Sequence, residues 1–247
     1  MPSELSKPGL WLFLLSVLWF AGGNILLGAL HKNSSTAARQ PRPVLQFDVG
    51  TQLVFDTRAS QTYTPDLYLV LDPGASRVSV TNNNPGIAVQ GQMLDGVLHL
   101  SIFDTVKAQN FSRARERLLI HVPASVRKMD FPARAAIGMS SDSAATIPEL
   151  DLTLTNCDTG IHISHLSIRR LKLSHTCQPL AGAPLPNNYV EMREHLSVEQ
   201  LEITMPAGRL QYTSDIIPQE IQLNLGSKVL VNARNEFIRS AHFGKLP

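Results

Sequence analysis

The sequence predicts an all-β fold, an irregular right-handed β-solenoid, preceded by one N-terminal transmembrane helix. Three observations predict it. The run Gly9–Leu30 contains no charged residue. Short segments in which apolar and polar residues alternate recur from Val44 onward. Strand–corner–strand units of weakly similar sequence follow one another in the second half of the chain. Because these units are irregular, a β-sandwich is the alternative architecture.

The composition is that of an ordinary globular protein. The chain has 247 residues, with 22 Lys and Arg against 20 Asp and Glu, 17% charged residues and 43% hydrophobic residues. These values exclude an intrinsically disordered protein and a polybasic nucleic-acid binder, so no nucleic-acid partner is expected.

The N-terminal apolar run is predicted to lie in a lipid bilayer. A helix needs about 20 apolar residues to cross the hydrocarbon core. Gly9–Leu30 supplies them, with Asn24 as its one strongly polar side chain. Trp11 and Trp19 are amphipathic rings of the kind found near headgroups. We therefore expect residues 1–30 to form a membrane anchor.

A cleaved signal peptide is the alternative for this segment. Lys7 supplies a weak basic start, and Ala21–Gly23 offers the small residues of a cleavage site. The apolar run continues through Ile25–Leu27, which favours an uncleaved anchor. We expect a single-pass protein of the inner membrane with its C-terminal domain in the periplasm, or a secreted protein if the segment is cleaved.

The remainder divides into a linker and one domain. Residues 31–43 are small, polar and proline-rich, and cannot bury enough apolar surface to fold, so they form a flexible tether. Residues 44–247 are numerous enough to bury a proper core. They form the predicted β-domain.

Period-2 alternation of apolar residues predicts the strands of this domain, because it places one side of each strand in a core and the other in solvent. The predicted strands are Leu67–Leu71, Arg77–Val80, Val97–Ile102, Leu118–Val122, Leu150–Thr155, Ile161–Ile163, Leu171–Leu173, Leu201–Thr204, Ile221–Leu225 and Val229–Val231. The turn signals between them are Asp72–Gly74, Asn82–Gly86, Asp95–Gly96, Asp158–Gly160 and Pro206–Gly208.

Weak internal similarity favours stacking of these strands. The related segments read LTLTNCDTGIHIS, LSIRRLKLSHTC, LEITMPAGRLQYT and IQLNLGSKVLVN. Each pairs an alternating strand with a corner and a second short strand. Such units cannot bury their apolar side alone, so they are expected to stack on one another as coils of a solenoid.

Several of these segments resemble the bacterial GIN-domain family, the autotransporter-adhesin head family, and related adhesin-like envelope domains. Asp95–Ile102 is similar to a DG-x-L-x-I strand of that family, and Leu119–Val126 to the I-x-V-P step that follows it. Asp158–Gly160 and Leu201–Leu210 resemble its stacked rungs. The resemblance implies a β-solenoid at the cell envelope, without catalytic residues. The chain departs from the family by its proline-rich insertion at Gln178–Asn188 and by lacking Gly/Ser-rich corners.

Cys157 and Cys177 are the two cysteines of the chain. In a solenoid with about 20 residues per coil they occupy neighbouring rungs, and strands about 4.8 Å apart lie within disulfide range. An exported domain meets an oxidising compartment, in which a disulfide persists. A disulfide and a pair of buried free thiols are both open.

Three histidines share the segment with these cysteines. His162, His165 and His175, together with the two thiols, are the one group with metal-ligand chemistry. The spacing is not that of a zinc finger, and His162 lies between two isoleucines, so it is expected to point to solvent. We expect neither a metal nor another cofactor.

A basic loop is the candidate anion-binding element. Lys107, Arg113, Arg115 and Arg117 lie between two predicted strands, with Glu116 among them. Phosphate or acidic glycans are its candidate ligands, and a solvated loop is the plainer reading.

Signatures of catalysis are missing from the sequence. There is no Gly-x-Ser-x-Gly elbow, no His-Glu-x-x-His and no phosphate-binding glycine loop. The densest acids are Asp142, Glu149, Asp151 and Asp158, and two of them suit local turns.

We therefore expect a membrane-anchored, non-catalytic envelope protein that presents an adhesin-like interaction surface to an envelope protein or a glycan. A polysaccharide-active enzyme on a β-helix scaffold and an envelope-stress sensor subunit are the alternatives. Open solenoid ends also allow self-association.

Overall fold

The computed structural model describes residues 44–245, apart from 59–64, 83–86, 105–116 and 178–186. They belong to a unit spanning Pro43–Pro247. The predicted anchor Gly9–Leu30 and the predicted linker at residues 31–43 lie outside the described residues. Over the described part of the chain, no helix has the length and apolarity needed to cross a membrane.

The fold is all-β, as predicted, and its described strands form one nearly closed sheet. The strands are β1 (Val44–Phe47), β2 (Gln52–Arg58), β3 (Asp66–Asp72), β4 (Val78–Thr81), β5 (Ile87–Leu94), β6 (Val97–Asp104), β7 (Leu118–Pro123), β8 (Lys128–Phe131), β9 (Ala136–Ser140), β10 (Thr146–Leu154), β11 (Gly160–Ile163), β12 (Leu166–His175), β13 (Tyr189–Met192), β14 (Leu196–Tyr212), β15 (Glu220–Ala233) and β16 (Ala241–Lys245). Within the described ranges the one helix is α2 (Asn235–Ser240).

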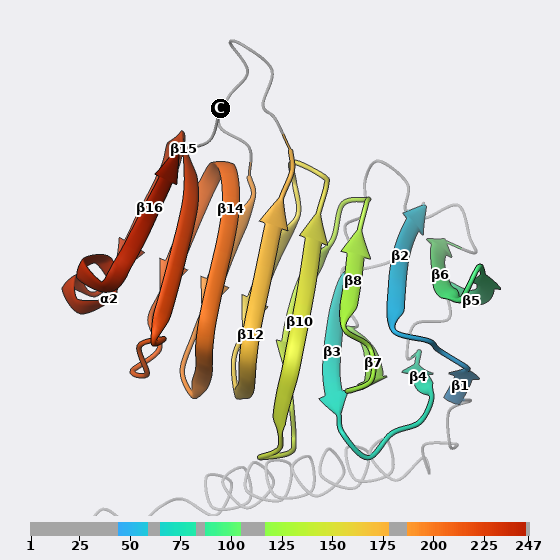
Figure 1. Cartoon of the computed structure of the whole chain (residues 1–247). Coiled ribbons are helices and arrows are strands. Elements are labelled where there is room, and N and C mark those ends of the chain that lie inside the picture. The colour runs from blue at the N-terminus through green and yellow to red at the C-terminus, as the bar shows by residue number, and fades with distance from the viewer. Residues whose placement is uncertain (1–43, 59–64, 83–86, 105–116, 178–186, 246–247) are drawn as a thin grey trace, which may run out of the picture. The chain divides into compact units, whose positions relative to one another are not determined.

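The sheet has two faces of parallel strands that enclose a common core. We call face A the set β6, β2, β8, β10, β12, the first part of β14, the first part of β15, and β16, in that order. Face B is the set β7, β3, β9, β11, β13 and the second parts of β14 and β15. From β8 onward each successive stretch of chain adds to both faces, and Figure 1 shows β8, β10, β12 and β14 side by side.

Apolar columns run through the core because the strands of each face are in register. On face A the column of adjacent residues is Leu98, Leu53, Met129, Leu152, Leu173, Ile203 and Leu223. On face B it is Leu118, Leu67, Ile137, Ile161, Val190 and Leu210. None of these side chains is more than 2% exposed. The alternation seen in the sequence thus marks the inner side of each strand.

The two faces meet at a sharp bend within β14 and β15. The pairing register of β14 shifts between Met205 and Ala207. Gly208 has φ +115°, a conformation that favours glycine. A Cβ at Gly226 would lie 2.0 Å from the carbonyl oxygen of Pro206, so only glycine allows this approach. The predicted turn at Pro206–Gly208 is therefore a bend within one continuous strand, because pairing with β15 continues on both sides of it.

The rung order at the N-terminal end of the stack differs from the chain order. β2 lies between β6 and β8, and β3 lies between β7 and β9. β1, β4 and β5 add to this end with antiparallel pairing. The first rung of the chain is thus enclosed by later ones, an arrangement that the sequence pattern does not reveal.

At the C-terminal end, α2 closes the core. Its Phe237 is 0% exposed and stacks on Tyr212, with ring centroids 4.2 Å apart. Arg234, just before the helix, forms an ion pair with Asp215. The helix thereby covers Tyr212 at this end of the core, while Val231 and Phe243 on the last strands stay 37% and 57% exposed.

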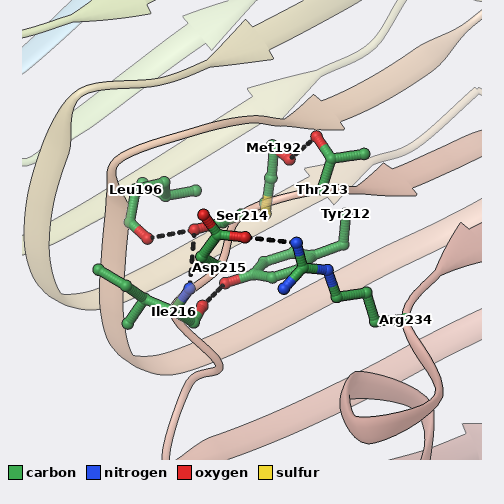
Figure 2. Close-up of polar contacts among 8 residues, drawn as sticks. All are labelled: Met192, Leu196, Tyr212, Thr213, Ser214, Asp215, Ile216 and Arg234. Carbon is green, nitrogen blue, oxygen red and sulfur yellow. Dashed lines mark hydrogen bonds and ion pairs between the residues drawn. The ribbon is translucent and has the colours of Figure 1, made fainter.

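Hydrogen bonds also fix the last corner between face B and face A (Figure 2). The hydroxyl of Tyr212 donates to the carbonyl oxygen of Ile216 at 2.5 Å, and Ser214 Oγ donates to that of Leu196 at 2.8 Å. Burial raises the pKa of Tyr212 to about 12, which keeps its hydroxyl a donor. These polar groups satisfy one another, so this cluster holds the corner in place and offers little to a ligand.

Every predicted strand overlaps an observed one, although several strands were not predicted. The unpredicted strands are β1, β2, β5, β8, β9, β13 and β16. Most are short, so few alternating residues mark them. The segment LSIRRLKLSHTC was expected to contain a corner, but residues Leu166–His175 form the single strand β12, because all of it pairs with β10 or β14.

Candidate functional site

The outer surface of face A is a self-contained charge ladder. Neighbouring strands place opposite charges and amides in register, and these pair with one another. The pairs are Arg170 Nη1 with Glu149 Oε1 (3.2 Å), Lys172 Nζ with Glu202 Oε1 (3.0 Å) and Gln200 Nε2 with Glu220 Oε2 (3.0 Å). A depression of about 380 Å³ lies over part of this ladder and is lined by Arg170, Gln200, Glu202 and Glu220, among others. Because its polar side chains are largely satisfied by neighbours, we assign face A a role in strand register.

The acids that the sequence singled out do not converge on one site. Glu149 and Asp151 lie on β10 of face A, where burial raises the pKa of Asp151. Asp142 follows β9, and Asp158 lies in the turn before β11, where its backbone N–H donates to Asn156 Oδ1 at 2.9 Å. These two residues sit at different corners of the fold, as suits turn-forming side chains.

The outer surface of face B carries an open pocket of about 340 Å³, which we call the face B pocket. It is lined by His162, Asn187, Asn188, Tyr189, Val190, Glu191, Gly208, Arg209, Gln211 and Leu230. These residues come from β11, β13, β14 and β15 and from the segment before β13.

Strand register brings the pocket residues together. Tyr189 of β13 is in register with Arg209 of β14, which is in register with Leu230 of β15. Two residues further along the strands, His162 is in register with Glu191, and Glu191 with Gln211. Adjacent strands lie about 4.8 Å apart, so each row forms a compact line of outward-pointing side chains.

The ring of Tyr189 forms an aromatic wall of the pocket. It lies over Gly160, where a Cβ would be 2.2 Å from the ring. Its centroid is 4.8 Å from that of the His162 ring. Burial raises the pKa of the Tyr189 phenol, so the hydroxyl stays protonated at neutral pH. Gly160 therefore lets an aromatic ring rest against the sheet.

Glu191, two residues after Tyr189 on β13, is a fixed anion in the pocket. Arg193 Nε lies 2.7 Å from its Oε1, and His162 Nδ1 lies 2.5 Å from its Oε2. The Arg193 hydrogen bond holds the pKa of Glu191 below its ordinary value. Burial lowers the pKa of His162 despite the attraction of Glu191. At neutral pH the carboxylate is thus ionised and its charge is balanced by Arg193.

Asn188 lies beneath the pocket and is 2% exposed. Its Nδ2 donates to the carbonyl oxygen of Ala207 at 2.8 Å. Its Oδ1 is buried and accepts no hydrogen bond from any described residue. A Cβ at Gly208 would lie 2.1 Å from this oxygen, so glycine is what allows the amide to sit there. The floor of the pocket therefore contains an unpaired acceptor.

Two side chains at the pocket have no polar partner. Arg209 and Gln211 make no side-chain hydrogen bond or ion pair with any residue that the structure describes. Leu230 beside them is 59% exposed. The pocket thus combines an aromatic ring, an apolar side chain, a free guanidinium and a free amide.

Of the two alternatives left open for the cysteines, the structure contains the disulfide. Cys157 and Cys177 are bonded, with their Cα atoms 5.1 Å apart. Cys157 follows β10 and Cys177 follows β12, which are adjacent parallel strands. The bond therefore joins neighbouring rungs, as the stacking argument anticipates.

The three candidate metal-binding histidines are separated by the fold. His162 points outward at the face B pocket. His165 lies at a corner with φ 52°, and its ring is 5.0 Å from that of His195, whose φ is 57°. His175 is 0% exposed in the core, where burial lowers its pKa to about 4. Within the described ranges, no three His, Cys, Asp or Glu side chains gather as a metal site.

The basic loop is described only at its last member. Lys107, Arg113 and Arg115 lie outside the described residues. Arg117 Nε lies 3.3 Å from Asp66 Oδ2, and its Cζ lies 5.9 Å from the centroid of the Tyr68 ring. Asp66 and Tyr68 are on β3, so Arg117 lies against face B, some strands away from the pocket.

The pocket itself was not predicted from the sequence. Its residues come from separate strands, and only the run Tyr189, Glu191 and Arg193 carries a local signal. These three alternate, so they project from one side of a strand. The partners that complete the pocket follow from strand register alone.

Comparisons with known proteins show distant structural likeness only. No family model matches the chain, and no curated protein matches it. A crystal structure of a putative adhesin from Bacteroides fragilis aligns with a TM-score of 0.38 and 9% identity over 83% of this chain and 96% of that one. A putative cell adhesion protein from Clostridium sporogenes aligns with a TM-score of 0.27 and 8% identity over 74% of this chain and 72% of that one. Likenesses of this degree assign neither a family nor a function.

Proposed function

We propose that this protein is a non-catalytic, envelope-tethered binding protein of the adhesin type, and that its stack of parallel strands is a right-handed β-solenoid presenting the face B pocket to a ligand. The observation that carries the proposal is the pocket's unpaired polar chemistry. Among the described residues Arg209 and Gln211 have no polar partner, and they lie beside the half-buried ring of Tyr189. The resemblance of the sequence to adhesin-head domains agrees with this role.

The rigidity of the scaffold supports a binding role. The pocket rests mainly on β11, β13 and the second part of β14, which are paired on both sides, with buried apolar columns behind them. Among the described strands, the part of β15 that carries Leu230 pairs with β14 alone. The Cys157–Cys177 bond restrains the corners between neighbouring rungs. A site held in this way loses little conformational entropy when a ligand binds, which favours affinity.

The carboxylate of the pocket supports a non-catalytic role. Hydrolysis of a glycosidic bond generally needs two carboxyl groups, one of them protonated through a raised pKa. Among the residues lining the pocket, Glu191 is the one carboxylate, and its pKa is lowered. Asp151, whose pKa is raised, lies on the other face. A polysaccharide-active enzyme is thus the weaker alternative.

The proposed location is the inner membrane, with residues 1–30 as the anchor, residues 31–43 as the tether and residues 44–247 in the periplasm. Secretion after cleavage of residues 1–30 is the alternative. The disulfide supports an exported domain, because such bonds persist in oxidising compartments.

Two measurements on the full chain test this function. A C-terminal alkaline-phosphatase fusion in a bacterial host should be active, and an inactive but well-expressed fusion would contradict the location. The detergent-purified chain, applied to an array of envelope polysaccharides, oligosaccharides and envelope proteins, should bind saturably to at least one component. Substituting Gln211 and Arg209 together by alanine should abolish that binding, whereas Gln200→Ala on face A should not. If no component of the array binds saturably, the binding role is refuted.

A further inference from the structure

We propose that the face B pocket binds a carboxylated sugar of an acidic saccharide, with Arg209 bound to the sugar carboxylate and the Tyr189 ring packed against the apolar side of the sugar ring. This inference rests on the proposed binding function and deepens it by naming the ligand class.

The charge balance of the pocket favours an anion. Arg193 and Glu191 neutralise each other at 2.7 Å, and His162 is held largely uncharged by burial at neutral pH. Arg209 remains as a cation without a partner among the described residues. A guanidinium matches the fork of a carboxylate with two parallel hydrogen bonds, which a neutral hydroxyl does not reproduce.

The apolar surfaces on either side of this cation suit a pyranose. Tyr189 and Leu230 are the register neighbours of Arg209, one on each side. A sugar ring has a face of C–H bonds and a rim of hydroxyls. The C–H bonds pack favourably on the electron-rich face of an aromatic ring. A carboxylated sugar resting on Tyr189 therefore places its charged substituent towards Arg209.

The remaining polar groups suit hydroxyls. Gln211 offers an amide that has no partner among the described residues, and Glu191 offers carboxylate oxygens fixed by Arg193. Asn188 Oδ1 accepts no hydrogen bond from the described residues, but it is buried beside Gly208, so we assign it no contact with the sugar.

A second aromatic ring extends this site along face B. Tyr68 lies over Gly138 as Tyr189 lies over Gly160, with a Cβ at Gly138 falling 2.8 Å from the ring. Gly138 and His162 are in register on adjacent strands. One strand step and two residue steps separate the two glycines, a distance of about 8 Å. Arg117, paired with Asp66, lies over the Tyr68 ring, with its Cζ 5.9 Å from the ring centroid, and adds a cation at that end. The two rings, the His162 imidazole and Arg117 therefore form a track for more than one acidic sugar, which predicts affinity that rises with oligomer length.

The test measures binding of the purified full chain to three acidic probes by calorimetry. The probes are oligosaccharides bearing galacturonate, glucuronate or sialic acid, each compared with its neutral methyl ester of the same length. At least one acid should bind, and its ester should bind at least about 10-fold more weakly, the loss expected for one charged hydrogen-bonded pair. Arg209→Gln should weaken binding of the acidic oligosaccharide about 10-fold or more. Arg239→Gln on α2, an exposed arginine away from the pocket, is the matched control and should change nothing.

Tyrosine variants test the packing role separately. Tyr189→Phe keeps the ring and should retain most of the affinity, while Tyr68→Leu should remove the gain from longer oligomers. Equal binding of acid and ester, or equal losses in Arg209→Gln and Arg239→Gln, would overturn the inference and leave the binding function standing. If none of the three acids binds but another array component binds saturably, the inference likewise fails and the binding function stands. Failure to bind anything at all would defeat both proposals.

Discussion

Acidification should destabilise this protein through His175. The side chain is 0% exposed and lies in register with Leu154 in an apolar column. Burial lowers its pKa from 6.5 to about 4. Between these two values the unfolded chain binds a proton that the folded chain does not. The contribution of His175 is therefore fully present above the unfolded pKa and is lost as the pH falls towards the folded pKa.

The size of this effect follows from the shift. The lowering of the His175 pKa from 6.5 to about 4 corresponds to about 3.5 kcal/mol at most, at about 1.4 kcal/mol for each pH unit. We expect the free energy of unfolding to fall by about 2–3 kcal/mol between about pH 7 and pH 4.5 because of this residue. His175→Leu fills the same column with an apolar side chain. The free energy of unfolding of this variant should lack the pH dependence caused by His175 and keep the pH dependence caused by other groups.

The assay is urea unfolding followed by circular dichroism, with the disulfide intact, at several pH values for both proteins. The variant also loses the contact of 3.4 Å between Asn188 Nδ2 and His175 Nδ1, so its stability at neutral pH is not the readout. The difference between the two pH slopes is the readout. Equal slopes, with unchanged m-values, would show that His175 is protonated in the folded protein and would refute the reasoning.

Three further predictions concern stability. Leu173→Ala should lower the free energy of unfolding by about 3–4 kcal/mol, because this 0%-exposed residue lies in the middle of a packed column; a urea-measured loss under about 1 kcal/mol would contradict that packing. Replacing Cys157 and Cys177 together by serine should cost about 3 kcal/mol, from the entropy of a loop spanning 20 residues, and a variant as stable as the oxidised protein would contradict it. Gly208→Ala should lower the melting temperature clearly, since φ is +115° and the Cβ would fall 2.1 Å from an amide oxygen; Gly74→Ala, whose nearest atom is 3.4 Å away, is the control and should lower it far less.

The strands were predictable where alternation extends over several residues. The long runs in β3, β6, β10 and β14 carry their inner and outer sides in the sequence itself. Short strands such as β8, β9 and β13 offer too few residues to distinguish a strand from a loop. Their conformation depends on pairing with strands on both sides, which is a tertiary effect.

The disulfide shows how far a spacing argument reaches. Cys157 and Cys177 meet because the chain between them makes one complete circuit of the stack. The next circuit is longer, since Ile168 pairs with Val198 after the proline-rich insertion. Because successive turns of the chain differ in length, the repeat has no constant spacing. The pairing register of later strands therefore could not be predicted by counting residues.

By itself the sequence determined that this domain is all-β and which side of each long strand is buried, because burial of alternate residues is a local property of a strand. Only the tertiary structure decided which outward side chains meet. Tyr189, Arg209 and Leu230 lie far apart in the chain and become neighbours through parallel pairing. Hydrogen-bonded register, which depends on bends and corners along the whole stack, is the physical reason that the pocket exists.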